Sequence, residues 1–387
     1  MRYVEIISAI VLVHFCFWWR FYKNPWRLCT SEVASNFFPY WRWFGKELRK
    51  GKFPLTDRIY YLSGASIPFL STFYPPNMLS SFLGAFLNDS RAFKLYSYQI
   101  LLHSLLACIF SFIMLSQWVN PLIALFGALS LTYTAYMIRP QTPCMMFTMA
   151  WIPACLIHGW FGVFAFGMAI LGGYWPTVIV SLPIFLYNPI CFLGAILALP
   201  QIIPFLKYYP KSIRAKKKID PAWGRMPLKR FFFRLQWPEN GMIHYPEYSF
   251  GVGICIPLAL YHFLFQHFVG WAIFTIIGFI GSQGVFVLDR IPARFVYLMS
   301  FSLVMGAVFA LHSIRIDYLL PPLIVLQFFL LWKNRDIYPS FPFSQWWKKI
   351  TEHKFIGKEW PNNTGYMTGE HHHDYFGGFS LAQNYRE

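Results

Sequence analysis

The chain has 387 residues, of which 56% are hydrophobic, 21% are aromatic and only 13% are charged. A soluble protein of this length could not bury so much apolar surface in one core, so the composition excludes a water-soluble globular protein and indicates a polytopic membrane protein. The formal net charge is +17, but the basic residues lie in loops between apolar segments, which favours contact with membrane lipids or a lipid phosphate over contact with nucleic acid.

The apolar segments predict about eleven membrane spans. The first, 3–19, ends in Trp-Trp-Arg and lacks a small-x-small cleavage site, so we interpret it as an uncleaved span and not as a signal peptide. A span needs about 20 apolar residues, or fewer where neighbouring helices cover its ends. On this basis we expect further spans at 97–115, 120–138, 143–158, 160–173, 175–188, 190–206, 251–268, 270–288, 295–311 and 318–332.

A polar loop, 20–96, separates the first two spans. Within it, the segment 36–50 places aromatic side chains on one side of a helix and basic side chains on the other. We therefore expect this segment to lie in the membrane interface, with its apolar face toward the lipid and its cations toward the headgroups. We interpret the whole loop as a substrate site that faces the bilayer surface.

The pattern of spans and loops divides the chain into four parts. These are an N-terminal membrane module at 1–206, a basic loop at 207–250, C-terminal membrane helices at 251–332 and a polar tail at 333–387. The cysteines show no pairing pattern and no CxxC motif, so the sequence supports neither a disulfide framework nor a zinc site.

A series of short motifs extends from about residue 30 to about residue 310. In the first loop they are Phe38-Pro39, Glu47-Leu48, Gly51-Lys52-Phe53-Pro54-Leu55, Gly64, Pro68 and Tyr74-Pro75. Later in the chain they are Trp151-Ile152-Pro153, Gln201-x-x-Pro204, Ser212-x-Arg214-Ala215, Glu247-Tyr248-Ser249-Phe250-Gly251 and Asp289-Arg290-Ile291-Pro292-Ala293-Arg294. In their order and spacing they resemble the motifs of YfhO-like membrane proteins, a branch of the GT-C type glycosyltransferases.

This resemblance implies an all-α, polytopic GT-C fold in the bacterial inner membrane, with a cytoplasmic N-terminus and two large extracytoplasmic loops, 20–96 and 207–250. It also implies an activity, the transfer of a sugar from a polyprenyl-phosphate donor to a cell-envelope glycan or lipid outside the membrane. The chain departs from the family pattern at Glu32, where an aspartate is usual, and at Thr56-Asp57-Arg58. A non-catalytic scaffold with the GT-C fold and a transporter or flippase of lipid-linked saccharides are the alternatives.

Sugar transfer of this kind needs a carboxylate that orients or deprotonates the acceptor hydroxyl. Glu32 occupies the loop position where the resemblance places the acid, and Asp57 is the second catalytic candidate. The alternatives are that Glu32 is a solvated acid or pairs with Arg27 or Arg42, and that Asp57 is a turn residue.

The transfer also needs cations, or a divalent metal, to hold the phosphate leaving group as negative charge builds on it. The candidate substrate-binding residues are Arg58, Arg214, Lys216, Lys217, Arg290, Arg294 and His103. The alternative for the lysine run is a cytoplasmic loop, for the last two arginines an interfacial anchor, and for His103 a hydrogen-bonded core histidine.

Overall fold

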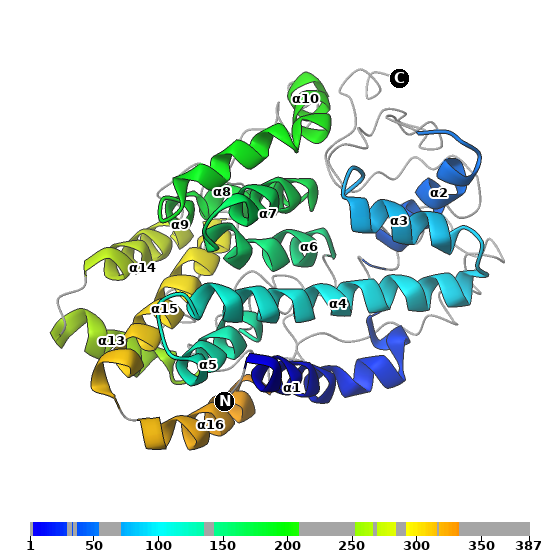
Figure 1. Ribbon diagram of the computed structural model, residues 1–387. Helices are drawn as coiled ribbons and strands as arrows, with labels where there is room; N and C mark the ends of the chain where they lie inside the picture. Colours follow the sequence, from blue (N-terminus) through cyan, green and yellow to red (C-terminus); the bar gives the residue numbers. More distant parts are fainter. Residues whose placement is uncertain are drawn as a thin grey trace.

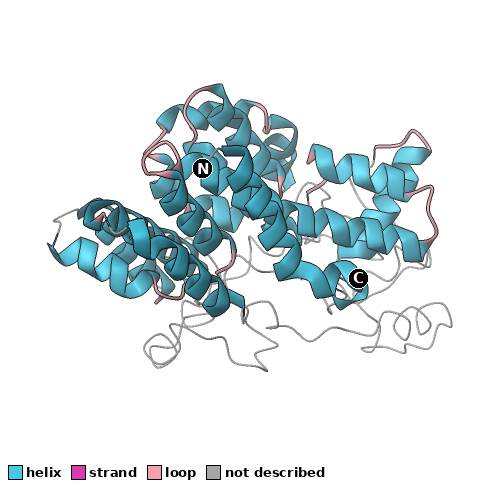
Figure 2. Ribbon diagram, turned by 60° about the horizontal axis from the view of Figure 1, so that its bottom comes forward, coloured by secondary structure: helices cyan, strands magenta, loops and turns pink. Residues whose placement is uncertain are grey.

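A computed structural model describes residues 3–28, 33, 37–53, 71–134, 143–208, 252–265, 269–283, 292–315 and 317–332. Over these ranges the secondary structure is helical, and they contain no strand (Figures 1 and 2). The all-α class predicted from the sequence is therefore confirmed for this part of the chain. The basic loop beyond residue 208 and the tail 333–387 lie outside the described residues.

Three helices are long and apolar enough to cross a membrane: α1 (Tyr3–Lys23), α4 (Asp89–Leu115) and α15 (Val296–Ile314). A fourth span is possible only if η5 (Pro189–Ile196) and α10 (Leu199–Tyr208), which are bent by 72°, act as one broken span. Six further apolar helices have 10–17 residues. At 1.5 Å per residue these are about 15–25 Å long, shorter than the hydrocarbon core of about 30 Å. Length and composition thus support three to four of the roughly eleven spans predicted from hydropathy.

The remaining helices are short, and many begin at a proline, which suits a first helical position because its missing amide hydrogen is not needed there. In chain order they are η1 (Pro25–Leu28), α2 (Phe38–Arg49), α3 (Pro75–Gly84), α5 (Pro121–Thr132), α6 (Pro143–Trp151), η4 (Pro153–Leu156), α7 (Trp160–Leu171), α8 (Trp175–Val180), α9 (Leu182–Phe185), α13 (Cys255–Phe265), α14 (Val269–Ser282), η8 (Pro292–Phe295), η9 (Asp317–Leu319) and α16 (Leu320–Trp332).

Helix α4 is the element on which the N-terminal half is built. Asn88 caps it, since its Oδ1 accepts a hydrogen bond from the amide of Arg91 at 2.9 Å. Helices α1, α3, α5 and α6 all contact α4, and α5 in turn contacts α15 and α16. Figure 1 shows the result, with α2 and α3 over the N-terminal half of α4, α13 to α15 near its other end and α16 beside α1. Helix α5 therefore joins the two halves.

A buried glutamine fixes the C-terminal helices to α5. The Nε2 atom of Gln327, on α16, donates to Ser130 Oγ at 2.9 Å and to the carbonyl of Val252 at 3.0 Å. Its Oε1 atom accepts from the amide of Ile254 at 3.0 Å. A side chain at Gly253, whose φ is +61°, would collide with this amide group. One side chain thus links α16, α5 and the segment before α13.

The prediction that 36–50 turns an aromatic face toward lipid is wrong. The segment does form a helix, α2, but the aromatic side chains of that helix are at most 7% exposed, because they face protein and not lipid. Phe38 packs on Phe93 of α4, and Trp41 packs on Tyr96. Arg42, expected at the headgroups, is also buried.

Helices α2 and α3 cross closely at a glycine. A Cβ atom on Gly45 would overlap the backbone carbonyl of Ser81, which belongs to α3. The hydroxyl of Ser81 donates to the carbonyl of Trp41 at 2.7 Å, which strengthens the same crossing. We call α2 and α3 together the α2–α3 hairpin.

Candidate functional site

The structure describes two of the residues that the sequence analysis selects, His103 and Arg294. The other candidates lie outside the described residues: Glu32, Asp57, Arg58, Arg214, Lys216, Lys217 and Arg290.

His103 lies on α4 and is 2% exposed. Its Nδ1 atom is 2.7 Å from the carbonyl oxygen of Gln99, one turn earlier, and its Nε2 atom is 2.6 Å from the hydroxyl of Tyr74. A carbonyl oxygen only accepts, so Nδ1 carries the proton and Nε2 accepts from the tyrosine. Both ring nitrogens therefore have partners, and a substrate can reach this ring only if Tyr74 moves aside.

Tyr74 is the centre of the arrangement. It immediately precedes α3, and its hydroxyl oxygen accepts a hydrogen bond from Trp151 Nε1 at 2.7 Å while donating to His103. Phe147 of α6 packs on both rings, with centroid distances of 5.5 Å to Tyr74 and 4.5 Å to His103. Burial raises the pKa of the Tyr74 phenol far above its ordinary value, although the hydrogen bond from Trp151 opposes the shift. The phenol is therefore protonated at neutral pH, as its donation to His103 requires.

A second set of polar side chains continues from Gln99 toward α2. Ser80 Oγ lies 2.5 Å from Gln99 Oε1, and Trp41 Nε1 donates to the same Ser80 oxygen at 3.2 Å. Gln99 Nε2 reaches Asn77 Oδ1 at 3.4 Å. Side chains of α2, α3, α4 and α6 are thus connected in one hydrogen-bonded network, which we call the Tyr74–His103 network. Such a network fixes relative positions, because each broken bond leaves a buried polar atom without a partner.

Two small cavities lie near this network. One has a volume of about 10 Å³ and is lined by His103, Ser104, Ala107, Thr132, Met146, Met149 and Ala150. The lining includes the buried hydroxyl of Thr132, a polar group on the wall that His103 also lines. A volume near 10 Å³ is at the lower limit for a single water molecule. A sugar phosphate does not fit in it.

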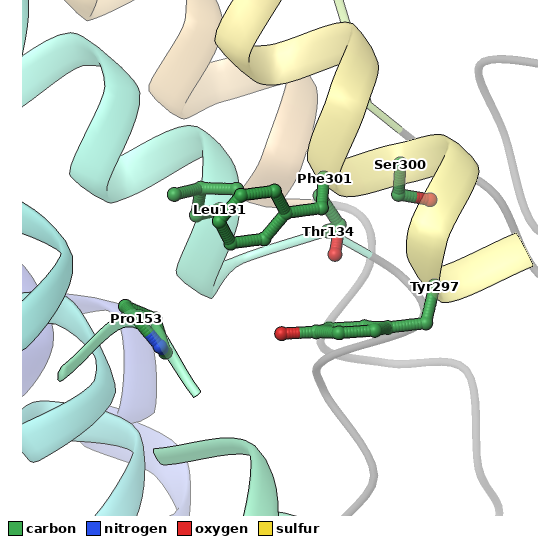
Figure 3. A pocket seen from close by; sticks show the side chains of 6 residues that line it. All are labelled: Leu131, Thr134, Pro153, Tyr297, Ser300 and Phe301. Atoms are coloured by element: carbon green, nitrogen blue, oxygen red, sulfur yellow. The ribbon is translucent and has the colours of Figure 1, made fainter. Parts of the chain in front are cut away.

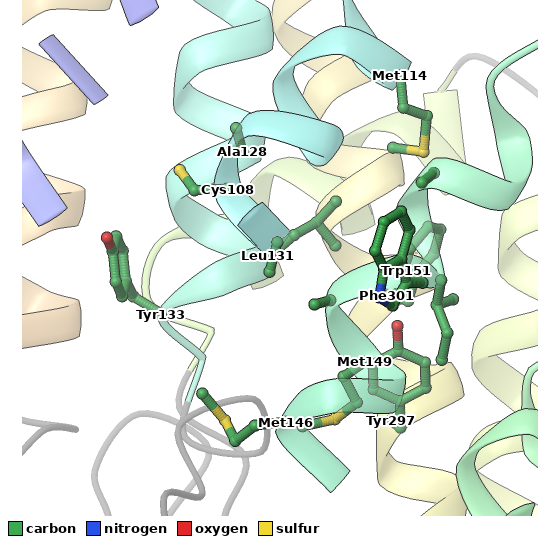
Figure 4. Packing of buried hydrophobic residues seen from close by; sticks show 14 of the residues in the cluster. Cys108, Met114, Ala128, Leu131, Tyr133, Met146, Met149, Trp151, Tyr297 and Phe301 are labelled. Carbon is green, nitrogen blue, oxygen red and sulfur yellow. The ribbon is translucent and has the colours of Figure 1, made fainter. Parts of the chain in front are cut away.

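The second cavity, also about 10 Å³, lies between α5, η4 and α15. Figure 3 shows its lining, Leu131, Thr134, Pro153, Tyr297, Ser300 and Phe301. Figure 4 shows part of the hydrophobic core, to which α4, α5, α6 and α15 contribute side chains and which includes Trp151. This packing holds the Trp151 indole in place, and hence also its hydrogen bond to Tyr74.

Arg294 is the second candidate that the structure describes. It belongs to η8, which contacts α8, α14 and α15, and it is 8% exposed. Its guanidinium carbon is 5.1 Å from the centroid of the Tyr174 ring, a cation–π distance. The amide of Tyr174 in turn donates to Thr148 Oγ1 at 3.0 Å, and the neighbouring residue on α6, Phe147, packs on His103.

The α2–α3 hairpin carries most of the charge near the network. Arg42 forms an ion pair with Asp89 at 2.7 Å and also donates to the carbonyls of Gly84 and Leu87, at the end of α3. Glu47 pairs with Lys50 at 2.5 Å. Over the described residues, no group of three or more His, Cys, Asp or Glu side chains could hold a metal ion.

Tyr74 and Trp151 fall within the motifs described above, but no sequence signal assigns a role to them or to Gln99. Contacts separated by 29 and 77 positions in the chain leave no local sequence pattern. The network can position the α2–α3 hairpin against the spans and hold a proton on His103 Nδ1. Comparisons of the chain with protein family models, with curated proteins and with solved structures find no match.

Proposed function

We propose that this chain is an integral membrane glycosyltransferase of GT-C type, which moves a sugar from a polyprenyl-phosphate donor to an acceptor outside the bacterial inner membrane. The observation that carries the proposal is the hydrogen bond between Trp151 and Tyr74. These residues belong to two points of the resemblance, Tyr74-Pro75 and Trp151-Ile152-Pro153, that are far apart in the chain. Residues that frame one active site must lie close together, so this contact supports the proposal.

The segments on either side of Glu32 add support. Trp26, before it, stacks on Phe93 of α4 at a centroid distance of 4.9 Å. Phe38, after it, packs on the same ring at 5.0 Å. Leu28 and Val33 are fully buried. The described segments on either side of the proposed acid thus pack at the N-terminal end of a candidate span, where a lipid-linked phosphate at a membrane surface would be met.

In the proposed reaction, the Glu32 carboxylate orients and deprotonates the acceptor hydroxyl, and Asp57 is the alternative base. Arg58, Arg214, Lys216, Lys217 and Arg290 supply positive charge to the phosphate leaving group, a role that a divalent metal could share. The Tyr74–His103 network positions the loop and takes no part in bond formation. Membrane lipids and the cell-envelope acceptor are the proposed partners.

The test compares sugar transfer from a radiolabelled polyprenyl-phosphate sugar by the purified full-length chain and its variants in lipid. Glu32→Gln keeps the shape of the side chain but cannot accept a proton, so we expect transfer to fall by about 10²–10⁴-fold at unchanged protein level. Glu32→Asp retains partial activity. Glu47→Gln is the matched control, because Glu47 is paired with Lys50 on the helix surface, and we expect near wild-type transfer.

Two results would contradict this assignment. If Glu32→Gln transfers sugar at the parental rate while Asp57→Asn does not, the base is Asp57. If neither substitution lowers the rate, or if the parent itself shows no transfer, the catalytic proposal is wrong. The non-catalytic scaffold and the flippase of lipid-linked saccharides then replace it.

A further inference from the structure

Helix α3 has its large apolar side chains on the outside. Three of them lie on one side of the helix: Leu79 is 62% exposed, Phe82 39% and Leu83 48%. Phe86, in the turn after α3, is 57% exposed and extends this stripe through its ring contact with Phe82 at a centroid distance of 5.3 Å. The opposite face carries small and polar residues, Asn77, Ser81 and Gly84, which are buried against α2 and α4. A helix in water shows the reverse arrangement. Small and polar residues at the protein contact and large apolar ones outside are typical of a helix surrounded by lipid.

The position of α3 along α4 sets its depth. Tyr74, at the start of α3, contacts His103, and Ser80 contacts Gln99, so the two helices run antiparallel along the first half of α4. Helix α4 has 27 residues, which gives a length of about 40 Å, about 10 Å more than the hydrocarbon core. Its first two turns can therefore project to the headgroup level. They carry Arg91 and Lys94, which are both exposed.

Basic side chains surround the C-terminal end of α3, which lies near the first turns of α4. The guanidinium carbon of Arg49 lies 4.8 Å from the centroid of the Phe86 ring, and Nη1 of that arginine donates to the carbonyl of Ala85 at 3.4 Å. Lys52 lies three residues further on and is exposed. In the ranges 37–53 and 71–94 the sequence has seven basic residues and two acidic ones, and both acids are already paired, with Arg42 and Lys50. The excess of positive charge lies where the apolar stripe ends.

We propose that the α3 stripe (Leu79, Phe82, Leu83 and Phe86) inserts into one leaflet of a membrane containing anionic lipid, with Arg49, Lys52, Arg91 and Lys94 bound to its phosphates. With ten residues, α3 is too short to span the bilayer. It therefore acts as an anchor that fixes the depth of the α2–α3 hairpin. Apolar side chains enter the acyl region, and neighbouring cations bind headgroups, as in other interfacial helices. The inference does not depend on transferase activity.

The experiment measures membrane depth by spin labelling the full-length chain in lipid nanodiscs. The background replaces Cys16 and Cys29 by serine. The remaining cysteines are all buried: Cys108, Cys144, Cys155, Cys191 and Cys255. A nitroxide is attached at Leu83→Cys, and at Leu79→Cys as a second position in case the first variant folds poorly. Ser90→Cys, exposed in the first turn of α4, is the matched control. Collision with oxygen reports the acyl region, and collision with a water-soluble nickel chelate reports the aqueous side.

We expect oxygen collisions to exceed nickel collisions at positions 83 and 79, with the opposite order at position 90. Replacing part of the phosphatidylcholine by phosphatidylglycerol is expected to lower the nickel collisions at position 83, and the combined variant Arg49→Gln with Lys52→Gln abolishes this response. A nickel-accessible label at both stripe positions overturns the insertion. Dipolar broadening between labels of two chains shows that a second copy covers the stripe, which also overturns it. An unchanged signal on adding phosphatidylglycerol overturns the anionic-lipid contact.

Discussion

Trp151 on α6 donates a hydrogen bond of 2.7 Å to the hydroxyl of Tyr74, which precedes α3. The same hydroxyl donates to Nε2 of His103 on α4. One tyrosine oxygen therefore connects the first polar loop to two apolar helices. Because all three side chains are buried, water cannot replace either bond if the hydroxyl is removed.

We expect Tyr74→Phe to destabilise the protein by at least about 2 kcal/mol, because it leaves two buried ring nitrogens, on Trp151 and His103, without partners, at about 1–3 kcal/mol each. The measurement is the midpoint of thermal unfolding in nanodiscs. Tyr98→Phe removes the hydroxyl of a tyrosine on α4 that is 40% exposed, and should leave the midpoint unchanged. Equal midpoints for Tyr74→Phe and the parent would show that the hydroxyl does not hold this network together.

Arg42 is predicted to be the residue that holds the end of α3 in place. Arg42→Lys keeps the charge but cannot reproduce the fork that contacts Asp89, Gly84 and Leu87 together. We expect a loss of about 1.5–3 kcal/mol, the range for hydrogen bonds to charged groups, and faster hydrogen exchange of the α3 amides by mass spectrometry. Lys50→Gln removes only an exposed pair with Glu47, worth about 0–1 kcal/mol. Equal exchange rates in both variants would contradict the role of Arg42.

Hydropathy located most of the apolar helices, but it misplaced a helix end that carries charged residues. The predicted spans 3–19 and 295–311 agree closely with α1 and α15, whereas α4 begins at Asp89 and not at residue 97. Its first two turns contain Arg91 and Lys94, which lower the hydropathy, although Asn88 is a recognisable cap. The predicted spans 143–158, 160–173 and 175–188 are separate helices in the structure too, and Gly159 and Gly173 between them have positive φ. Helix caps and glycine turns can be predicted from the sequence because each depends on only a few neighbouring residues.

The candidate site was less predictable, because it depends on contacts that sequence alone does not show. The periodicity of 36–50 correctly indicates an amphipathic helix, but it cannot distinguish an apolar face on lipid from one on α4. Burial of Trp41 and Arg42 settles that question for α2. In α3, by contrast, the small and polar face is buried, so the apolar stripe is the exposed side. The orientation of Tyr74 toward His103 likewise follows only from the antiparallel packing of α3 on α4.

Gln327 is predicted to be necessary for the attachment of α16. Gln327→Leu has a similar volume but removes the donors to Ser130 and Val252 and the acceptor for the Ile254 amide. We expect a loss of about 1–3 kcal/mol, since buried partners remain unsatisfied. The check is limited proteolysis together with the thermal midpoint. The comparison is Gln117→Leu, a partly buried glutamine that bonds Met114, Leu156 and the amide of His158. We expect a smaller loss there because these groups are closer to the surface, and an equal effect of both would argue against a special role for Gln327.

The last prediction concerns which side of the membrane the first polar loop faces. The proposed function requires loop 20–96 to be extracytoplasmic, although Arg20, Lys23 and Arg27 follow the first span and the positive-inside tendency opposes this orientation. Asn88 is a poor labelling position because its side chain caps α4. Ser90→Cys, in a background with Cys16 and Cys29 replaced by serine, is exposed and leaves the cap intact.

We expect a membrane-impermeant maleimide to label this cysteine in intact bacterial cells as fully as in lysed cells. A cysteine introduced at Ser313, exposed near the C-terminal end of α15, reports on a second position in the same assay. Protection of position 90 in intact cells, with labelling only after lysis, would place the loop in the cytoplasm. The cations around α3 would then face the cytoplasmic leaflet, where anionic lipid is also present, so membrane insertion of α3 would stand while the extracytoplasmic transferase would not.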